Sequence, residues 1–342
     1  HPVPGGTAVA ALELAAALVA RNDVELVGVA GRHRNLPAAE FRSPIETRQL
    51  PIGRPLLYEA WNRTGHPRVE RATGPVDVCH STLAVPAGTK APHVVTVHDI
   101  AFMHTPDRFT RHGSRVMVAG LERCRSATLI TCPSEVTRRD LIDVCFDGGR
   151  LRVVPWGVEV PTVAAADIDR VRAQYRLPDE FVLFVGTVEP RKNLARLAEA
   201  VERSDSELPL VVAGASGWGE QGAHGGQFIG FLPASDLAAV YAAAALFAYP
   251  SLQEGFGFPV AEAMAHGVPV VTSRGTSAEE VAGGAAQLVD PSDVASIADG
   301  IDAALEHRVA LRVAGLERAA TMTWSACAES MSAVYHEAAL CR

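Results

Sequence analysis

Tyr249-Pro-Ser-Leu-Gln-Glu-Gly-Phe-Gly-Phe-Pro-Val-Ala-Glu-Ala-Met-Ala-His-Gly-Val-Pro-Val-Val-Thr-Ser-Arg-Gly275 is the stretch of sequence that decides the fold. It opens with a turn and a glycine-containing loop. Pro259 suits the first turn of a helix, where its missing N–H is no loss. Gly267 is a typical residue to end that helix, and the valines that follow predict a short buried strand. The stretch therefore predicts a loop–helix–strand unit of an α/β sheet.

Two acids and two glycines give this unit a chemical character. Gly255 and Gly257 leave the backbone bare before a helix N-terminus, where unpaired N–H groups and a partial positive charge favour an anion such as phosphate. Glu254 lies in the loop and Glu262 about one turn into the helix, so we expect them to flank one small volume. Carboxylates accept hydrogen bonds from vicinal hydroxyls. The combination suggests a nucleotide-sugar site, and a plain loop–helix unit with two solvated acids is an equally weighted alternative.

The composition of the chain limits the class of protein. Its 342 residues suggest two domains, and with 48% hydrophobic and 20% charged residues a large core is expected. The net charge of −8 argues against a general nucleic-acid binder. The 6 cysteines contain no C-x-x-C pair, which favours buried free thiols in a reducing compartment. No signal peptide or membrane span is visible, so a cytoplasmic location is expected.

Apolar runs of strand length recur along the chain, separated by helical stretches. This alternation predicts parallel sheets. A loop at 1–6 that opens straight into a helix at 7–20 would require an earlier strand, which the sequence lacks. The runs lie at 24–30, 76–80, 94–97, 129–132, 151–154, 181–185, 210–213, 228–232, 246–249, 268–271 and 286–289.

Charged and titratable residues follow two of these strands. Arg191 and Lys192 come after the strand at 181–185 and the turn at Gly186, and two cations at a strand end suit a diphosphate. His98 ends the strand at 94–97 with Asp99 beside it, where open α/β sheets bind ligands. The structural alternatives are a surface Arg–Lys pair and a histidine that satisfies a loop carbonyl.

The frame from Glu254 to Val271, with seven residues between Glu254 and Glu262, resembles the E-x7-E signature of retaining glycosyltransferases of family 4. The resemblance covers nearly the whole chain, strongly at 151–291 and weakly at 36–71. It implies an α/β fold of the GT-B type, with two doubly wound parallel-sheet (Rossmann-like) domains facing across a cleft. An acceptor-side domain is expected at 1–158 and a nucleotide-sugar donor domain at 159–323, with a C-terminal helix at 324–342 that packs back on the first domain.

The resemblance also implies the residues of the donor site. Glu254 would hold sugar hydroxyls, Glu262 the ribose, and His98 would orient the sugar near the transition state. The expected catalytic residues are His98, Glu254, Arg191 and Lys192, and the expected donor-binding residues are Gly5, Gly6, Gly186, Arg191, Lys192, Phe231, Leu232, Glu254, Gly255, Phe256, Gly257 and Glu262.

The implied reaction moves a hexosyl group, with retention, from a nucleotide-diphosphate sugar to a hydroxyl of a glycan or glycolipid acceptor in cell-surface polysaccharide or glycolipid synthesis. The stretch 184–193 looks most like members that use GDP-mannose or a deoxyhexose nucleotide, so a mannosyltransferase is favoured, with UDP-glucose as the competing donor. Cationic side chains and amides would offset the charge of the leaving group, so no metal and no other cofactor is expected. Asp167-Ile-Asp169 is similar to a metal-binding pair but falls in a linker.

A basic helix is expected at 109–125, with arginines interleaved among apolar residues. Such a helix can rest on anionic lipid, which would give peripheral contact with the inner face of a membrane. A solvated charged face is the commoner role of such a pattern and is preferred here.

Three other classes stay open. The first is an epimerase or phosphorylase of the same fold; a phosphorylase needs a pyridoxal-bearing lysine, and the only lysines are Lys90 and Lys192. The second is a non-catalytic sugar-nucleotide sensor, against which the full set of acids and cations argues. The third is a structural α/β module, which leaves that set unexplained. Hydrolysis of a donor without acceptor would exclude the sensor.

Overall fold

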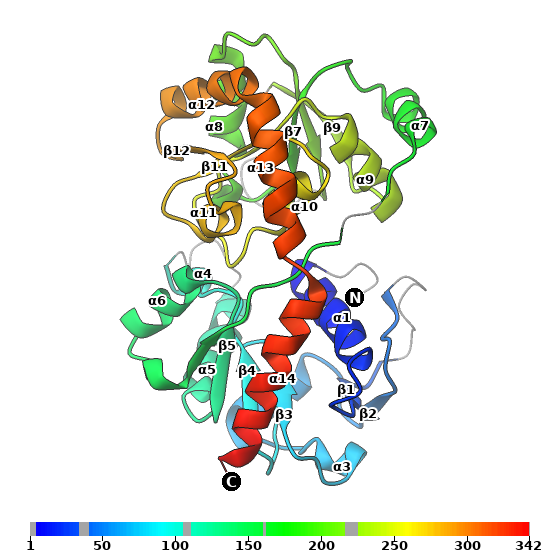
Figure 1. Ribbon diagram of the computed structural model, residues 1–342. Coiled ribbons are helices and arrows are strands. Elements are labelled where there is room, and N and C mark those ends of the chain that lie inside the picture. Colours follow the sequence, from blue (N-terminus) through cyan, green and yellow to red (C-terminus); the bar gives the residue numbers. More distant parts are fainter. Residues whose placement is uncertain (1–4, 34–40, 105–110, 160–161, 216–224, 342) are drawn as a thin grey trace. The chain divides into compact units, whose positions relative to one another are not determined.

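The computed structural model describes residues 5–33, 41–104, 111–159, 162–215 and 225–341. The chain divides into two units (Figure 1). Unit 1 comprises residues 1–157 and 324–342, and unit 2 comprises residues 158–323. The boundary predicted from the sequence, after residue 158, differs by one residue.

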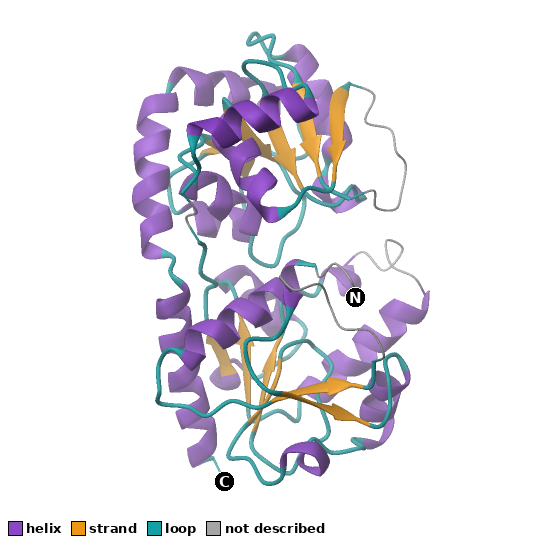
Figure 2. Ribbon diagram, turned by 90° about the vertical axis from the view of Figure 1, so that its right-hand side faces the viewer, coloured by secondary structure: helices purple, strands orange, loops and turns teal. Residues whose placement is uncertain are grey.

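Unit 2 is built on one six-stranded sheet in which every neighbouring pair of strands is parallel. The predicted doubly wound parallel sheet is thereby confirmed, and helices lie on both of its faces (Figure 2). The four strands at its centre are short apolar runs that are buried along their whole length. The strands are β7 (Val182–Val185), β8 (Leu210–Ala213), β9 (Gly226–Gly230), β10 (Leu246–Tyr249), β11 (Val270–Ser273) and β12 (Gln287–Val289).

The helices of unit 2 pack in pairs, α8 with α12, α7 with α9 and α10 with α13. The predicted helix from Pro259 to Gly267 is confirmed as α10, with proline in its first turn and Gly267 just after its end at φ 68°. The helices are α7 (Ala165–Tyr175), η4 (Pro190–Lys192), α8 (Leu194–Arg203), α9 (Ala234–Ala243), α10 (Phe258–Ala265), α11 (Ser277–Ala282), α12 (Val294–Glu306) and α13 (Arg308–Thr321).

The strand order of unit 2 fixes where a ligand can bind. The order is β12-β11-β10-β7-β8-β9, so the chain moves outward in one direction from β7 and in the other from β10. In a parallel sheet of this order, ligands bind beyond the carboxyl ends of the two central neighbours, where the connections leave toward opposite sides. The loops after β7 and β10 carry Arg191, Lys192 and Glu254.

Unit 1 has a four-stranded parallel sheet, in the order β3-β4-β5-β6, and a separate parallel pair of β1 with β2. Strand β2 was not predicted, and it lies in the stretch 36–71 that the sequence pattern left irregular. The strands are β1 (Gly28–Gly31), β2 (Thr47–Leu50), β3 (Cys79–Ser81), β4 (His93–Thr96), β5 (Leu129–Cys132) and β6 (Leu151–Val153).

The first and the last helix of the described chain, α1 and α14, both belong to unit 1. The last helix, α14, lies against α1 and the sheet strand β4 (Figure 1). Met331 and Val334 of α14 are buried, and the Tyr335 hydroxyl is hydrogen-bonded to His80 Nδ1 at 2.8 Å. The helices are α1 (Gly6–Val19), α2 (Leu56–Thr64), α3 (Glu70–Thr73), α4 (Ala101–His104), α5 (Arg111–Cys124), α6 (Glu135–Asp143), η3 (Gly148–Arg150) and α14 (Trp324–Leu340).

Three further predictions concern the surface and the cysteines. All six cysteines are free, four of them buried. Within the described residues no helix is both long and apolar enough to cross a membrane. On the basic helix α5, Arg115 pairs with Glu59 at 3.3 Å, and just after it Arg125 pairs with Glu122 at 2.9 Å. These pairings favour the solvated charged face over lipid contact.

Candidate active site

The turn after β7 brings both predicted phosphate-binding cations to the strand end. Pro190 begins the short helix η4, and Asn193 closes it in the left-handed region at φ 61°. The Asn193 amide donates hydrogen bonds to the carbonyls of Pro250 and Pro291, at 3.0 and 2.6 Å. These bonds tie the turn to the loops after β10 and β12. Asn193 is the N-cap residue of α8, but its side-chain oxygen accepts from Arg196 at 2.9 Å and caps no main-chain N–H.

The loop from β10 to α10 presents Glu254. The Ser277 hydroxyl donates to the main-chain oxygen of Glu254 at 2.8 Å, which fixes the loop on α11. Gly257 then begins α10 with φ 108°, and a Cβ at this position would lie 3.3 Å from Ala278 Cα. Only glycine satisfies both the backbone angle and this close approach.

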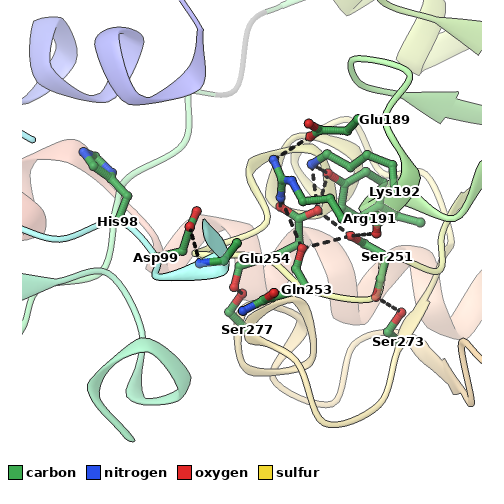
Figure 3. Close-up of polar contacts among 12 residues, drawn as sticks. His98, Asp99, Glu189, Arg191, Lys192, Ser251, Gln253, Glu254, Ser273 and Ser277 are labelled. Atoms are coloured by element: carbon green, nitrogen blue, oxygen red, sulfur yellow. Dashed lines mark hydrogen bonds and ion pairs between the residues drawn. The ribbon is translucent and has the colours of Figure 1, made fainter. Parts of the chain in front are cut away.

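Four charged residues, Glu189, Arg191, Lys192 and Glu254, form a connected group that we call the cation–carboxylate cluster (Figure 3). Lys192 Nζ lies 2.7 Å from Glu254 Oε1, and Arg191 Nη1 lies 3.0 Å from Glu254 Oε2. The other terminal nitrogen of Arg191, Nη2, lies 2.7 Å from Glu189 Oε1. The side chains of Lys192 and Glu254 are 9% and 7% exposed, so this pair is buried.

Two hydroxyl groups complete the surroundings of Glu254. Tyr249, at the end of β10, donates to Glu254 Oε1 at 3.0 Å, and Ser251 donates to the same oxygen. Lys192 Nζ in turn donates to the Tyr249 hydroxyl. Oε1 thus accepts three hydrogen bonds, whereas the bond recorded at Oε2 comes from Arg191. Oε2 is therefore the oxygen with capacity for a further donor.

Electrostatics keep this carboxylate ionised despite its burial. Burial acts to raise the pKa of Glu254, but the charges of Lys192 and Arg191, with hydrogen bonds from Lys192 and Ser251, outweigh it and lower the pKa to about 2. Burial raises the pKa of Tyr249 well above its ordinary value, so its hydroxyl stays a donor. Burial also lowers the pKa of Lys192, against which the Glu254 charge acts.

The second acid of the signature has its own partner. On α10, the carboxyl of Glu262 accepts a hydrogen bond from the Tyr241 hydroxyl of α9 at 2.8 Å. Burial raises the pKa of Glu262, and the Tyr241 bond opposes this shift. The Tyr241 ring stacks on His266, with centroids 5.3 Å apart. The structure thus gives Glu254 charged partners and Glu262 a neutral one.

The remaining predicted donor-site residues of unit 2 are distributed over three loops. Beyond β9, Phe231 is 56% exposed whereas Leu232 is buried. Phe256 is buried in the loop that also holds Gly255, and its ring meets Phe258 edge-on at 5.2 Å. The main chain at Gly186, after β7, is closely approached: a Cβ on Gly214 would lie 2.0 Å from the Gly186 oxygen.

In unit 1, the predicted sugar-orienting residue is His98, with Asp99 beside it. His98, beyond β4, donates from Nε2 to the Thr82 carbonyl at 2.9 Å and stacks on Trp156 with centroids 5.6 Å apart. This is the loop-carbonyl contact considered as a structural alternative, and it leaves Nδ1 of the neutral ring as an acceptor. Burial lowers the pKa of His98, while its bond to Thr82 opposes the shift. Asp99 accepts from the Ala101 N–H at 3.0 Å.

The glycines predicted to face phosphates begin α1. Gly5 is its N-cap residue, with φ −80°, and Gly6 is its first helical residue. A Cβ on Gly5 would meet nothing within 4 Å. The Gly5 backbone therefore does not require a positive φ. Residues 1–4 of the predicted loop lie outside the described residues.

The Asp167 and Asp169 pair, predicted to fall in a linker, lies in helix α7. Asp167 lies in the first turn of α7 and Asp169 two residues later, about half a turn further, so their side chains point to different sides of the helix. In the part of the chain that the structure describes, no group of three or more histidine, cysteine, aspartate or glutamate side chains could hold a metal ion.

Sequence reasoning missed three residues that hold the predicted ones. Tyr249 and Ser251 were interpreted only as a turn, and Tyr241 only as part of an alanine-rich helix. Their partners lie at sequence separations of 5, 3 and 21 residues. Glu189 was also missed, although a carboxylate two residues before Arg191 in a strand-end loop was a signal. The cations and carboxylates that these residues contact suit a phosphorylated, hydroxyl-rich ligand at the carboxyl ends of β7 and β10.

Comparisons with known proteins identify the class to which this fold and site belong. A family model described as Glycosyl transferases group 1 matches residues 167–320, and one described as Glycosyltransferase Family 4 matches residues 4–160. The HepE protein of Anabaena, solved in complex with UDP and glucose, superposes with a TM-score of 0.73 at 19% identity, over 98% of this chain and 97% of that one. The fold is therefore that of the GT-B glycosyltransferases.

Proteins related in sequence identify the family within the GT-B glycosyltransferases. The O-antigen chain mannosyltransferase B of Escherichia coli is 34% identical over 258 residues, which is 68% of this chain and 67% of that protein. The serotype-specific mannosyltransferase WbdA of Escherichia coli is 34% identical over 182 residues, 47% of this chain and 22% of that protein. The chain belongs to glycosyltransferase family 4 and is a glycosyltransferase, as the E-x7-E frame predicted.

Proposed function

We propose that this glycosyltransferase transfers a mannosyl group from GDP-mannose to a hydroxyl of a glycan or glycolipid acceptor, with retention at the anomeric carbon. The observation that carries the donor half is the placement of Arg191, Lys192 and Glu254 at the carboxyl ends of β7 and β10, where the sheet order reverses. The names of the two relatives support a mannosyl donor and an acceptor in surface-polysaccharide assembly.

The proposed chemistry follows from the groups on unit 2. The diphosphate would lie against Lys192, Arg191 and the N–H groups at the start of α10, which offset the charge that grows on the leaving group. Glu254 Oε2 would accept from a sugar hydroxyl, since Oε1 already accepts three hydrogen bonds. Glu262 would accept from the ribose, and the exposed ring of Phe231 supplies a face for the base.

The bond changes of the proposed reaction balance without a further reactant. The acceptor oxygen bonds to the anomeric carbon on the face from which the diphosphate leaves. The bond from that carbon to the β-phosphate oxygen breaks, and the acceptor proton passes to the departing phosphate. His98, neutral because burial lowers its pKa, would orient the sugar through Nδ1. No side chain is required as a covalent nucleophile.

A thermal-shift panel with GDP, UDP, ADP and dTDP tests the donor site. A nucleotide at 100 times its Kd stabilises the folded protein by about 2.7 kcal/mol, so a clear rise in Tm is expected with GDP. Arg191→Ala should reduce this rise. If no nucleotide raises Tm, the donor-site proposal fails.

The same panel decides between the two donors. The complexes of HepE with UDP and with UDP-glucose favour a uridine nucleotide as the second candidate. A larger rise with UDP than with GDP would replace GDP-mannose by UDP-glucose in the proposal.

The rate of donor hydrolysis tests whether Lys192 contributes to catalysis. We expect Lys192→Ala to lower the rate of GDP-mannose hydrolysis by about 100- to 1,000-fold, because it removes one charge at the developing oxyanion. Hydrolysis of the donor without acceptor also separates a catalyst from a sensor. An unchanged rate in Lys192→Ala would remove this residue from the mechanism.

A further inference from the structure

Glu189 sits where it can govern the charge of the donor site. It immediately precedes η4, and its side chain is 9% exposed. Arg191 bridges the two acids of the cation–carboxylate cluster, with Nη2 on Glu189 at 2.7 Å and Nη1 on Glu254 at 3.0 Å (Figure 3). One guanidinium therefore shares its charge between two carboxylates.

The charges of the cluster cancel. Arg191 and Lys192 contribute two positive charges, and Glu189 and Glu254 contribute two negative ones, so the four side chains sum to zero. A nucleoside diphosphate carries at least two negative charges at neutral pH. A site whose cations are already paired attracts such an anion less strongly than the two cations alone would.

The two acids are not equivalent in this balance. Glu254 is fixed by Lys192, Tyr249 and Ser251 as well as by Arg191, so its position does not depend on the guanidinium alone. Glu189 contacts the cluster at Nη2 of Arg191, and the arginine side chain is 24% exposed. The Nη1 atom is held separately, by Glu254 and by the Gln253 carbonyl at 3.1 Å. An incoming anion can therefore compete with Glu189 for Nη2 while Glu254 and Lys192 stay in place.

We propose that Glu189 is an affinity-setting counter-charge: it holds Arg191 in the ligand-free protein and competes with the diphosphate for its guanidinium. This inference rests on the proposed function and deepens it, because it concerns how tightly the same site holds donor and product. A carboxylate that competes for the arginine weakens diphosphate binding and speeds release of the nucleoside diphosphate after transfer.

A positioning role for Glu189 predicts the opposite sign. If its contact served only to orient Arg191 for the phosphates, removing the carboxylate would leave the arginine disordered and binding would weaken. The direction of the change in Kd thus separates a competing charge from a supporting one.

Calorimetric titration of Glu189→Gln with GDP and UDP tests the inference. We expect Kd for the nucleotide that binds the wild type to fall about tenfold, equivalent to about 1.4 kcal/mol. Glu180→Gln is the matched control: it removes the same charge from an exposed pair with Arg308 in the same unit and should leave Kd unchanged. The corresponding nucleoside, which lacks phosphates, should bind both proteins equally.

Further variants keep the test decisive. Glu189→Asp retains the charge and should bind nucleotide nearly as the wild type does. Glu189→Ala removes the charge in a different way and should tighten binding as Glu189→Gln does, which covers a folding defect in either variant. An equal or larger Kd in these charge-removing variants overturns the inference while the proposed function stands. If the wild type binds no nucleoside diphosphate at all, both fall together.

Discussion

The polar side chains in and after the parallel strands differ in charge between the two units. In unit 2, the residues after β7 and β10 are ionised, and each buried charge has an opposite charge within 3.0 Å. In unit 1, the histidine within β3 and the one just beyond β4 are neutral rings held by hydroxyls and a carbonyl. His80 lies between Tyr335 and Thr96, at 2.8 Å from each, and His98 donates to a carbonyl.

This difference shows how each unit accommodates burial of polar groups. Burial, followed by the neighbouring His93 and His98, lowers the pKa of His80 to about 3, so that ring carries no charge at neutral pH. Burial raises the pKa of Glu254, but the paired cations overcome it and lower the pKa to about 2. Unit 2 thus holds a charged site that can act on an anion, whereas unit 1 holds uncharged donors and acceptors.

The largest expected effect comes from breaking the charged pair. In Lys192→Met, Glu254 loses its buried partner, and we expect the free energy of unfolding of unit 2 to fall by about 3–5 kcal/mol. Hydrogen exchange of the amides of β7 and β10 measures this, since their protection reports the opening of that sheet.

The only other lysine in the sequence supplies the control. Lys90 is exposed in unit 1, so Lys90→Met should leave this exchange as in the wild type. A loss below about 1 kcal/mol in Lys192→Met would mean that the pair does not behave as a buried one.

Acid sharpens the comparison further, because it should weaken unit 1 first. The pKa of His80 is about 3 in the folded chain against an ordinary 6.5, so the unfolded chain takes up the proton first and stability falls below about pH 6.5. The contribution of Glu254 is complete above about pH 4.5 and is lost only as the pH falls toward 2. The expected slope in unit 1 is up to about 1.4 kcal/mol per pH unit for each such histidine.

Tryptophan fluorescence can follow this loss in one unit. A Trp218→Phe variant retains Trp61, Trp156 and Trp324, all of which belong to unit 1. Urea midpoints from this variant should decline between pH 7 and pH 5. A midpoint that stays constant over that range would show that the unit 1 histidines are not buried as neutral rings.

A smaller effect is expected at the neutral partner of Glu262. Tyr241→Phe removes the hydroxyl that donates to Glu262 Oε2 at 2.8 Å, so this carboxylate oxygen loses the hydrogen bond that positions it. We expect the preference for GDP over 2′,3′-dideoxy-GDP to drop by about tenfold, as the loss of a hydrogen bond to a carboxylate of about 1.5 kcal/mol implies. Calorimetric titration with both nucleotides measures it.

Tyr175 offers a matched variant for that measurement. Its hydroxyl donates to the Asp236 carboxyl at 2.6 Å in the same unit, so Tyr175→Phe removes a similar bond between α7 and α9 residues. This variant should keep the preference for the ribonucleotide. An unchanged preference in Tyr241→Phe would contradict the assignment of Glu262 to the ribose.

The sequence predicted those parts of the molecule that local pattern determines. The apolar strands of unit 2 and the helix α10 with its proline and glycine ends follow from periodicity and backbone preferences. Strand β2 escaped because three of its four residues are exposed and its Thr-Arg-Gln-Leu sequence has no apolar alternation. Asn193 precedes α8 as its N-cap residue, but the bonds of its amide to the distant Pro250 and Pro291 carbonyls could not be predicted from the sequence.

The residue types of the site could be predicted from the sequence, but the ion pairs among them could not. The family resemblance pointed to Arg191, Lys192 and Glu254 as separate binding groups. Their mutual neutralisation depends on contacts that span 62 and 63 residues, which only the strand order brings together. Glu189 was overlooked because the sequence does not show which cation a loop acid contacts, although its place two residues before Arg191 was a signal.

The return of α14 to unit 1 has a consequence for synthesis on the ribosome. Residues 158–323 form an uninterrupted unit, so unit 2 has all of its sheet and helices before α14 has been made. Unit 1 begins earlier but has to wait for the helix that covers α1 and β4 and that supplies Tyr335 to His80. We therefore expect the half of the protein that is translated first to finish folding last, with the apolar surface that α14 covers exposed until then.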